Sequence, residues 1–155
     1  MHLRVAKSPS EALALTNCAF VNPSDQPADG CHYVTLDGRY RFNLRTDATV
    51  MAGHVGLSKV QRSWAQLALL DEVQVEPFDP TRENGCADNL TVQVDFMRKG
   101  GDLGGAVFDS GKLAEAFHAQ FDLHIFTVAQ VPKPLEESCA NIFCRNLFST
   151  LAMIT

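Results

Sequence analysis

The sequence lacks any long apolar run, which excludes a membrane-spanning helix from its expected structure. Such a helix requires about 18 or more consecutive apolar residues. The longest candidate, residues 146–155, is shorter and is interrupted by Ser149 and Thr150. The opening residues 1–7 also lack the apolar core of a secretory signal. We therefore expect a cytoplasmic protein without direct membrane insertion.

Cysteine and histidine are sparse, and their spacing fits no metal or disulfide pattern. The five cysteines are odd in number and include no C-x-x-C pair. The five histidines show neither H-x-H nor H-E-x-x-H spacing. A disulfide framework and a zinc site are both disfavoured, because each normally shows closely paired residues. Free and mostly buried thiols are expected at Cys18, Cys31, Cys86, Cys139 and Cys144.

No motif for catalysis is complete. A G-x-S-x-G elbow is absent. The glycines of residues 99–105 are followed by Ala106, where a phosphate-binding loop needs lysine and serine or threonine. This segment therefore reads as a flexible connector. Cys18 or Cys31 with His32 would offer a nucleophile and a base, but a packed structural thiol is favoured. We expect no active site, cofactor or metal in this chain.

The charge balance argues against a general affinity for polyanions. The formal net charge is −5, which disfavours nucleic acid and anionic lipid as partners. A local basic patch is still compatible with this value. Four cations stand at expected strand ends or in loops, where binding residues collect: Lys7, Arg62, Arg98 and Lys99. Taken by position alone, solvated surface charges are the simpler interpretation.

Short strands dominate the first half of the chain. The clearest signal is Asp37-Gly38 between residues 32–36 and 39–44, because this pair supplies the positive backbone torsions of a tight hairpin. Further strands are expected at residues 3–6, 55–57 and 73–76. Short strands at this close spacing favour a small closed barrel, since closure removes exposed sheet edges. Trp64, in an expected helical turn, is interpreted as a core residue.

The second half reads differently, as strand, helix and strand. Residues 90–97 alternate as a strand, residues 110–121 place apolar side chains at helical spacing, and residues 123–128 return to strand. Residues 81–89 look like a linker. The expected division is therefore a barrel over residues 1–83, an incomplete α/β subdomain over 84–130, and a divergent, partly disordered tail over 131–155. The fold class is mainly β, or α+β.

Several segments, taken in order, form a recognisable series of motifs. The most specific block is Gln61-Arg62-Ser63-Trp64-Ala65. Other blocks are Leu13-Ala14-Leu15-Thr16-Asn17-Cys18-Ala19, Tyr40-Arg41-Phe42-Asn43-Leu44 and Val92-Gln93-Val94-Asp95-Phe96. Over roughly residues 4–130 the sequence thereby resembles one family, the N-ethylmaleimide-sensitive fusion proteins, which are vesicle-fusing ATPases. The resemblance implies a double-psi β-barrel followed by a smaller α/β subdomain, with a groove between them.

The resemblance also implies a function. In this family the N-terminal domain binds the SNAP adaptor on a SNARE bundle, and two ATPase domains that use ATP and magnesium, and would form a hexamer, follow it. Lys7 and Arg62 fall on basic adaptor-contacting positions of the groove. Lys99 falls on the first of a lysine pair whose second member is Gly100 here, with Arg98 on the other side. A cytoplasmic adaptor-binding domain, held to membranes through SNAP and SNARE, is expected.

After Gln130 the sequence departs from the family. Residues 131–155 match neither the remaining strands of the second subdomain nor the ATPase domains. Without a nucleotide loop, no ATP turnover is expected from these 155 residues. The alternative to adaptor binding is a truncated structural or dominant-negative fragment that does not dock.

Overall fold

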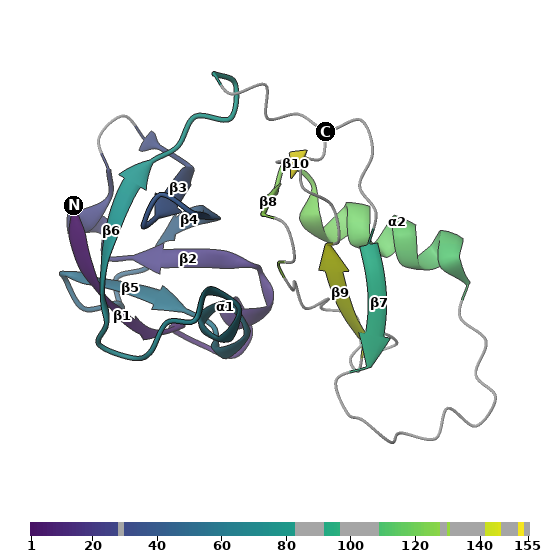
Figure 1. Ribbon diagram of the computed structural model, residues 1–155, viewed down its shortest axis with the longest axis horizontal. Helices are drawn as coiled ribbons and strands as arrows, with labels where there is room; N and C mark the ends of the chain where they lie inside the picture. Colours follow the sequence, from purple (N-terminus) through teal and green to yellow (C-terminus); the bar gives the residue numbers. More distant parts are fainter. Residues whose placement is uncertain are drawn as a thin grey trace.

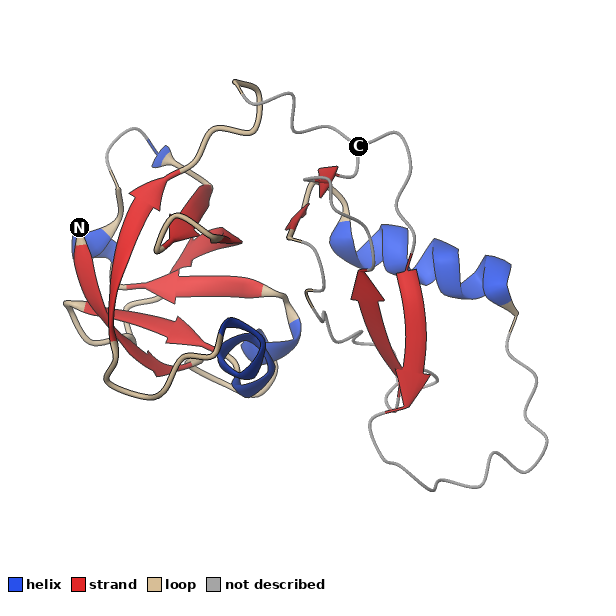
Figure 2. Cartoon of the chain, in the orientation of Figure 1, coloured by secondary structure: helices blue, strands red, loops and turns tan. Residues whose placement is uncertain are grey.

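The computed structural model describes residues 1–27, 30–82, 92–96, 109–127, 130, 142–146 and 152–153. Its longer strands are β1 (His2–Lys7), β2 (Cys18–Val21), β3 (Tyr33–Leu36), β4 (Tyr40–Thr46), β5 (His54–Leu57), β6 (Glu72–Pro77), β7 (Val92–Phe96) and β9 (Ile142–Asn146). The short elements are β8 (Ile125–Phe126), β10 (Ala152–Met153), η1 (Leu13–Leu15) and η2 (Pro23–Asp25), and the α-helices are α1 (Lys59–Ala65) and α2 (Ser110–Phe121). Strands predominate, as Figure 2 shows.

The first half forms a closed barrel with the strand order β1-β5-β2-β4-β3-β6, and β6 pairs back to β1 (Figure 1). The pairs β1–β5 and β2–β4 are parallel, and the other pairs are antiparallel. The two halves of the barrel are equivalent in topology: if β1 is exchanged with β4, β2 with β5 and β3 with β6, the strand order around the barrel is unchanged. The same exchange converts one parallel pair into the other. This is the double-psi β-barrel that the sequence analysis expected. Its internal two-fold is a property of topology, since the sequence shows no repeat.

The barrel encloses its own hydrophobic core. Alternate residues of β1 and β6 point inward, so that Leu3, Val5, Val73 and Val75 are buried. The core cluster runs from Leu3 to Val75 and draws on all six strands. Burial of these apolar side chains is the main stabilising term of the fold.

The predicted hairpin is confirmed. β3 and β4 pair from Tyr33↔Asn43 to Leu36↔Tyr40. The turn residues Asp37 and Gly38 have φ values of 49° and 65°, as a two-residue hairpin turn requires.

Helix α1 closes one end of the barrel. Trp64 is partly buried against the core, with its ring edge-on to Tyr40 at 5.1 Å and to Phe42 at 5.7 Å between centroids. The assignment of Trp64 to the core is thereby confirmed.

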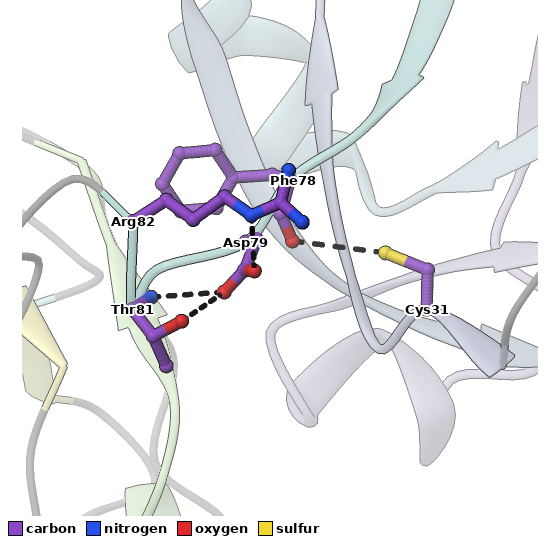
Figure 3. A network of polar contacts seen from close by, with 5 residues as sticks. All are labelled: Cys31, Phe78, Asp79, Thr81 and Arg82. Carbon is purple, nitrogen blue, oxygen red and sulfur yellow. Dashed lines mark hydrogen bonds and ion pairs between the residues drawn. The ribbon is translucent and has the colours of Figure 1, made fainter.

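A short polar turn follows β6, and Figure 3 shows it. The Asp79 carboxylate accepts hydrogen bonds from the Thr81 backbone N–H at 3.0 Å and from the Thr81 hydroxyl at 2.7 Å. It also pairs with Arg82 Nε at 3.1 Å. The hydrogen bonds from Thr81, chiefly, lower the pKa of Asp79. Cys31 Sγ donates to the Phe78 carbonyl at 3.7 Å, which connects the segment after β6 with the segment before β3.

The second half contains α2, which spans the residues that the sequence predicted. Its inward side chains Phe117 and Phe121 pack with Phe126 of β8, with ring centroids 4.8–5.8 Å apart. β7 pairs antiparallel with β9 along its whole length, and β8 pairs with β10. Two strands therefore come from the tail, which the sequence analysis expected to be partly disordered.

The expected boundary near residue 84, and the glycine-rich connector at residues 99–105, lie outside the described residues. Within the described part of the chain, no helix has the length and apolar character needed to cross a membrane.

Candidate functional site: a basic corner of the barrel

Lys7 and Arg62 are brought to the same corner of the barrel. Lys7 ends β1 opposite Leu57, the last residue of the parallel strand β5. The Leu57 carbonyl accepts hydrogen bonds from the Ser8 N–H at 3.0 Å and from Arg62 Nη1 at 2.5 Å. The Arg62 guanidinium therefore lies beside the chain that follows Lys7. Lys7 is exposed, and Arg62 is half-buried.

Helix α1 holds Arg62 in place through a capping box. The Ser58 hydroxyl accepts from the Gln61 N–H at 3.2 Å, and the Gln61 side chain accepts from the Ser58 N–H at 2.7 Å. Gln61 Nε2 also donates to the Cys18 carbonyl at 3.2 Å, which fastens the helix to β2. The first turn of α1 is thus buried and fixed by the two hydrogen bonds of the capping box. Arg62 projects from this turn, so its position is set before any partner binds.

Lys59 is a further cation at this corner, and the sequence analysis did not single it out. It is exposed at the first position of α1, three residues before Arg62, a spacing that makes helix side chains neighbours. A cation at a helix N-terminus opposes the helix dipole. A lysine at this electrostatically unfavourable position was the one sequence feature that could have marked Lys59 as a candidate site residue.

The three cations have no carboxylate partner within the described ranges. The ion pairs found there join His2 to Glu72 and Arg82 to Asp79. Lys7, Lys59 and Arg62 are therefore available to an external anion. We call these three residues the basic corner. Arg98 and Lys99, the other predicted site residues, lie outside the described residues, so their distance from the corner is not defined.

A second polar region lies where the barrel meets α2 and β8. Hydrogen bonds cross it from Tyr33 Oη to the Leu123 carbonyl at 2.9 Å, from the Ile125 N–H to Asn43 Oδ1 at 3.3 Å, and from the Arg41 N–H to Thr127 Oγ1 at 3.1 Å. A cavity of about 210 Å³ opens here. It is lined by Cys18, His32, Tyr33, Asn43, Leu44, Arg45, Asp122, Leu123 and His124.

The cysteine–histidine hypothesis is not supported by the contacts in this region. The imidazole in contact with Cys18 belongs to His124, with Sγ and Nε2 3.9 Å apart, although His32 lines the same cavity. Burial raises the pKa of the Cys18 thiol, against smaller opposing effects of Thr16 and Arg45. Cys31 Sγ donates to the Tyr33 carbonyl at 2.7 Å. Cys18 is therefore a packed, protonated thiol. Among the described side chains, no group of three or more metal-ligating residues comes together.

The sequence is similar to proteins of vesicle fusion. It is 30% identical over 131 residues to the vesicular-fusion protein SEC18 of Saccharomyces cerevisiae, which is 83% of this chain and 17% of that protein. It is 28% identical over 129 residues to sec18 of Schizosaccharomyces pombe, and 29% identical over 128 residues to the vesicle-fusing ATPase of Caenorhabditis elegans. The matches cover 80–83% of this chain but only 15–17% of these relatives. No protein-family model matches.

Two solved structures of rationally designed proteins, mkDPBB_sym1 and mkDPBB_sym_86, align with half of this chain. Each is 19% identical with a TM-score of 0.42, and the alignments cover 98% and 91% of those chains.

Proposed function

Because the chain is a relative of the vesicle-fusing ATPases over one segment of their length, we propose that it is an adaptor-binding domain of that family. In this proposal the basic corner docks onto an acidic surface of the SNAP adaptor, and through it onto a SNARE bundle. The domain acts in the cytoplasm, is held at membranes only through these partners, and serves SNARE disassembly in vesicle transport. Its own part of the work needs no nucleotide or metal.

One observation carries the proposal: Lys7 pairs with Leu57 in the sheet, Arg62 donates to the Leu57 carbonyl, and neither cation has a carboxylate partner in the described residues. Arg62 is held by its hydrogen bond to the Leu57 carbonyl, so it loses little side-chain entropy on binding and suits recognition better than a mobile surface charge does. The net charge of −5 makes the cationic corner a local exception. An acidic partner would therefore be steered to this face and repelled elsewhere.

Docking through exposed charges should be fast and sensitive to salt. Added salt shortens the Debye length from about 10 Å at 0.1 M to about 3 Å at 1 M, which screens such contacts. The affinity for the adaptor–SNARE complex should accordingly fall as salt rises from about 0.05 M to about 0.5 M. The change should appear mainly in the association rate.

The test is the binding of the purified chain to a SNAP–SNARE complex, followed by biolayer interferometry. Lys7→Glu and Arg62→Glu should each weaken binding about tenfold, and the double variant more, because each places a carboxylate against an acidic surface. Lys59→Glu should weaken binding less if the corner is centred on Lys7 and Arg62. The matched control is Lys112→Glu, which changes an exposed cation on α2 by the same charge.

Binding that survives the double variant unchanged would refute the basic corner as the site. Absence of binding by the unmodified chain would instead support the alternative of a folded fragment that does not dock. Binding should be equal with and without magnesium and ATP. ATP turnover by the purified chain would contradict the expectation that it has no catalytic site.

A further inference from the structure

His124 belongs to the second subdomain, and its two ring nitrogens each lie close to a carbonyl oxygen, one in the barrel and one in its own subdomain. Nε2 lies 3.1 Å from the Thr16 carbonyl oxygen, in the segment that leads into β2. Nδ1 lies 3.0 Å from the Asp122 carbonyl oxygen, just after α2. The side chain is 9% exposed, and its ring is edge-on to Phe121 with centroids 5.5 Å apart.

A carbonyl oxygen only accepts hydrogen bonds, so each of these contacts requires an N–H on the imidazole. A neutral imidazole has one N–H and leaves the lone pair of its other nitrogen facing an oxygen. An imidazolium has two N–H groups and satisfies both oxygens. We propose that His124 is protonated when the two subdomains are docked, and that loss of this proton loosens the docking.

The groups around the ring are compatible with one buried positive charge. From β2, Cys18 Sγ lies 3.9 Å from Nε2 and donates to the Thr16 carbonyl at 3.4 Å. The single thiol proton serves either that carbonyl or an unprotonated Nε2, so a neutral ring finds only a weak S–H donor here. From the same cavity wall, Arg45 opposes the charge and Asp122 favours it, and both of these side chains are exposed. His32 and Tyr33 complete the titratable lining.

The rest of the docking surface makes this single proton important. Several hydrogen bonds cross it, and two buried amide nitrogens there, Asn17 Nδ2 and Asn43 Nδ2, have no partner in the described structure. Unsatisfied buried donors destabilise the docked state. An interface that already holds two unsatisfied buried donors should respond measurably to one hydrogen bond gained or lost.

Two measurements on the full chain test the proposal. Long-range ¹H–¹⁵N NMR of the His124 ring distinguishes an imidazolium, with two protonated nitrogens, from either neutral tautomer. Amide hydrogen exchange reports docking, because the N–H groups of Arg41 and Ile125 donate across the interface. The Val5 N–H, bonded to the Asp71 carbonyl within the barrel at 2.8 Å, is the internal reference.

We compare about pH 5.5 with about pH 8, and expect the ring to carry two N–H groups where the docking is protected and one where it loosens. Over this range the protection of Arg41 and Ile125 relative to Val5 should fall about tenfold, as expected for the loss of a charged hydrogen bond. His124→Gln should abolish this pH dependence. The control His118→Gln, at an exposed position of α2, should retain it. The proposal is overturned if the His124 ring is a single neutral tautomer at every pH, or if the protection of Arg41 and Ile125 relative to Val5 does not change with pH. Both outcomes can be observed even if His124→Gln fails to fold.

Discussion

The thiol of Cys18 is 2% exposed and lies in the wall of the inter-subdomain cavity. Burial raises its pKa, because the charged thiolate is disfavoured away from water. Since the thiolate is the reactive form, alkylation at about pH 8 should be slower at Cys18 than at the more exposed Cys31, by about tenfold or more. Timed iodoacetamide labelling with peptide mass spectrometry measures both rates.

The same labelling in urea supplies the control for Cys18. Once the chain is unfolded, the two cysteines should react at similar rates, because the difference comes from burial. Equal rates in the folded protein would show that Cys18 is accessible and ionised, and would restore it as a candidate nucleophile.

Single residues differ in how far the sequence can predict their roles. Arg62 was singled out as a candidate because it sits in a distinctive motif. Its contact partner Leu57 is five residues away, so local helix geometry is enough to bring them together. His124 was not found, because its partner Thr16 is 108 residues away and nothing local marks the pairing. The same distance explains why His32, adjacent in sequence to Cys31, looked like the better partner for a thiol.

Helix α1 is short, and its start is stabilised by side chains more than by its own hydrogen bonds. Ser58 accepts from Gln61 N–H and is itself buried, so Ser58→Ala should reduce the free energy of unfolding by about 1–2 kcal/mol. Urea denaturation followed by Trp64 fluorescence measures this change. Under the proposed function, Ser58→Ala should also weaken adaptor binding, because α1 carries Arg62.

The control for Ser58→Ala is Ser63→Ala, in the same helix. Ser63 is exposed inside α1, and alanine has the higher helix propensity, so stability should hold or rise slightly. If both substitutions cost the same, the capping box contributes nothing and the loss reflects the residue change alone.

Elements with strong local signals were predicted well. The β3–β4 hairpin follows from Asp37-Gly38, and α2 follows from the spacing of Leu113, Phe117 and Phe121. The expected strand at residues 123–128 is described only as β8, Ile125–Phe126. Leu123 has a positive φ of 55°, which breaks an extended run and exposes that side chain. Pairing of β9 with β7 was not expected, because antiparallel partners this far apart have no local signature.

At the scale of the whole molecule, the two halves differ in how they are held together. The barrel closes through hydrogen bonds on every strand and buries a core that runs from Leu3 to Val75. No residue of the second subdomain belongs to that described cluster. The halves meet through polar contacts such as Gln130 Nε2 to Asn17 Oδ1 at 3.1 Å. The barrel should therefore fold without its neighbour, whereas the docking should be separable.

A chain that ends at Arg82 tests this independence. It should unfold cooperatively, since the closed barrel and its core remain whole, and it should be less stable than the full chain by only about 1–3 kcal/mol from lost interface hydrogen bonds. Urea denaturation with amide exchange at Val5 and Phe42 measures this. A chain without cooperative unfolding would mean that the second subdomain is part of the folding unit. In that case the proton on His124 would control global stability as well as docking. The two experiments together therefore decide whether the subdomains are separate folding units that dock, or parts of a single folding unit.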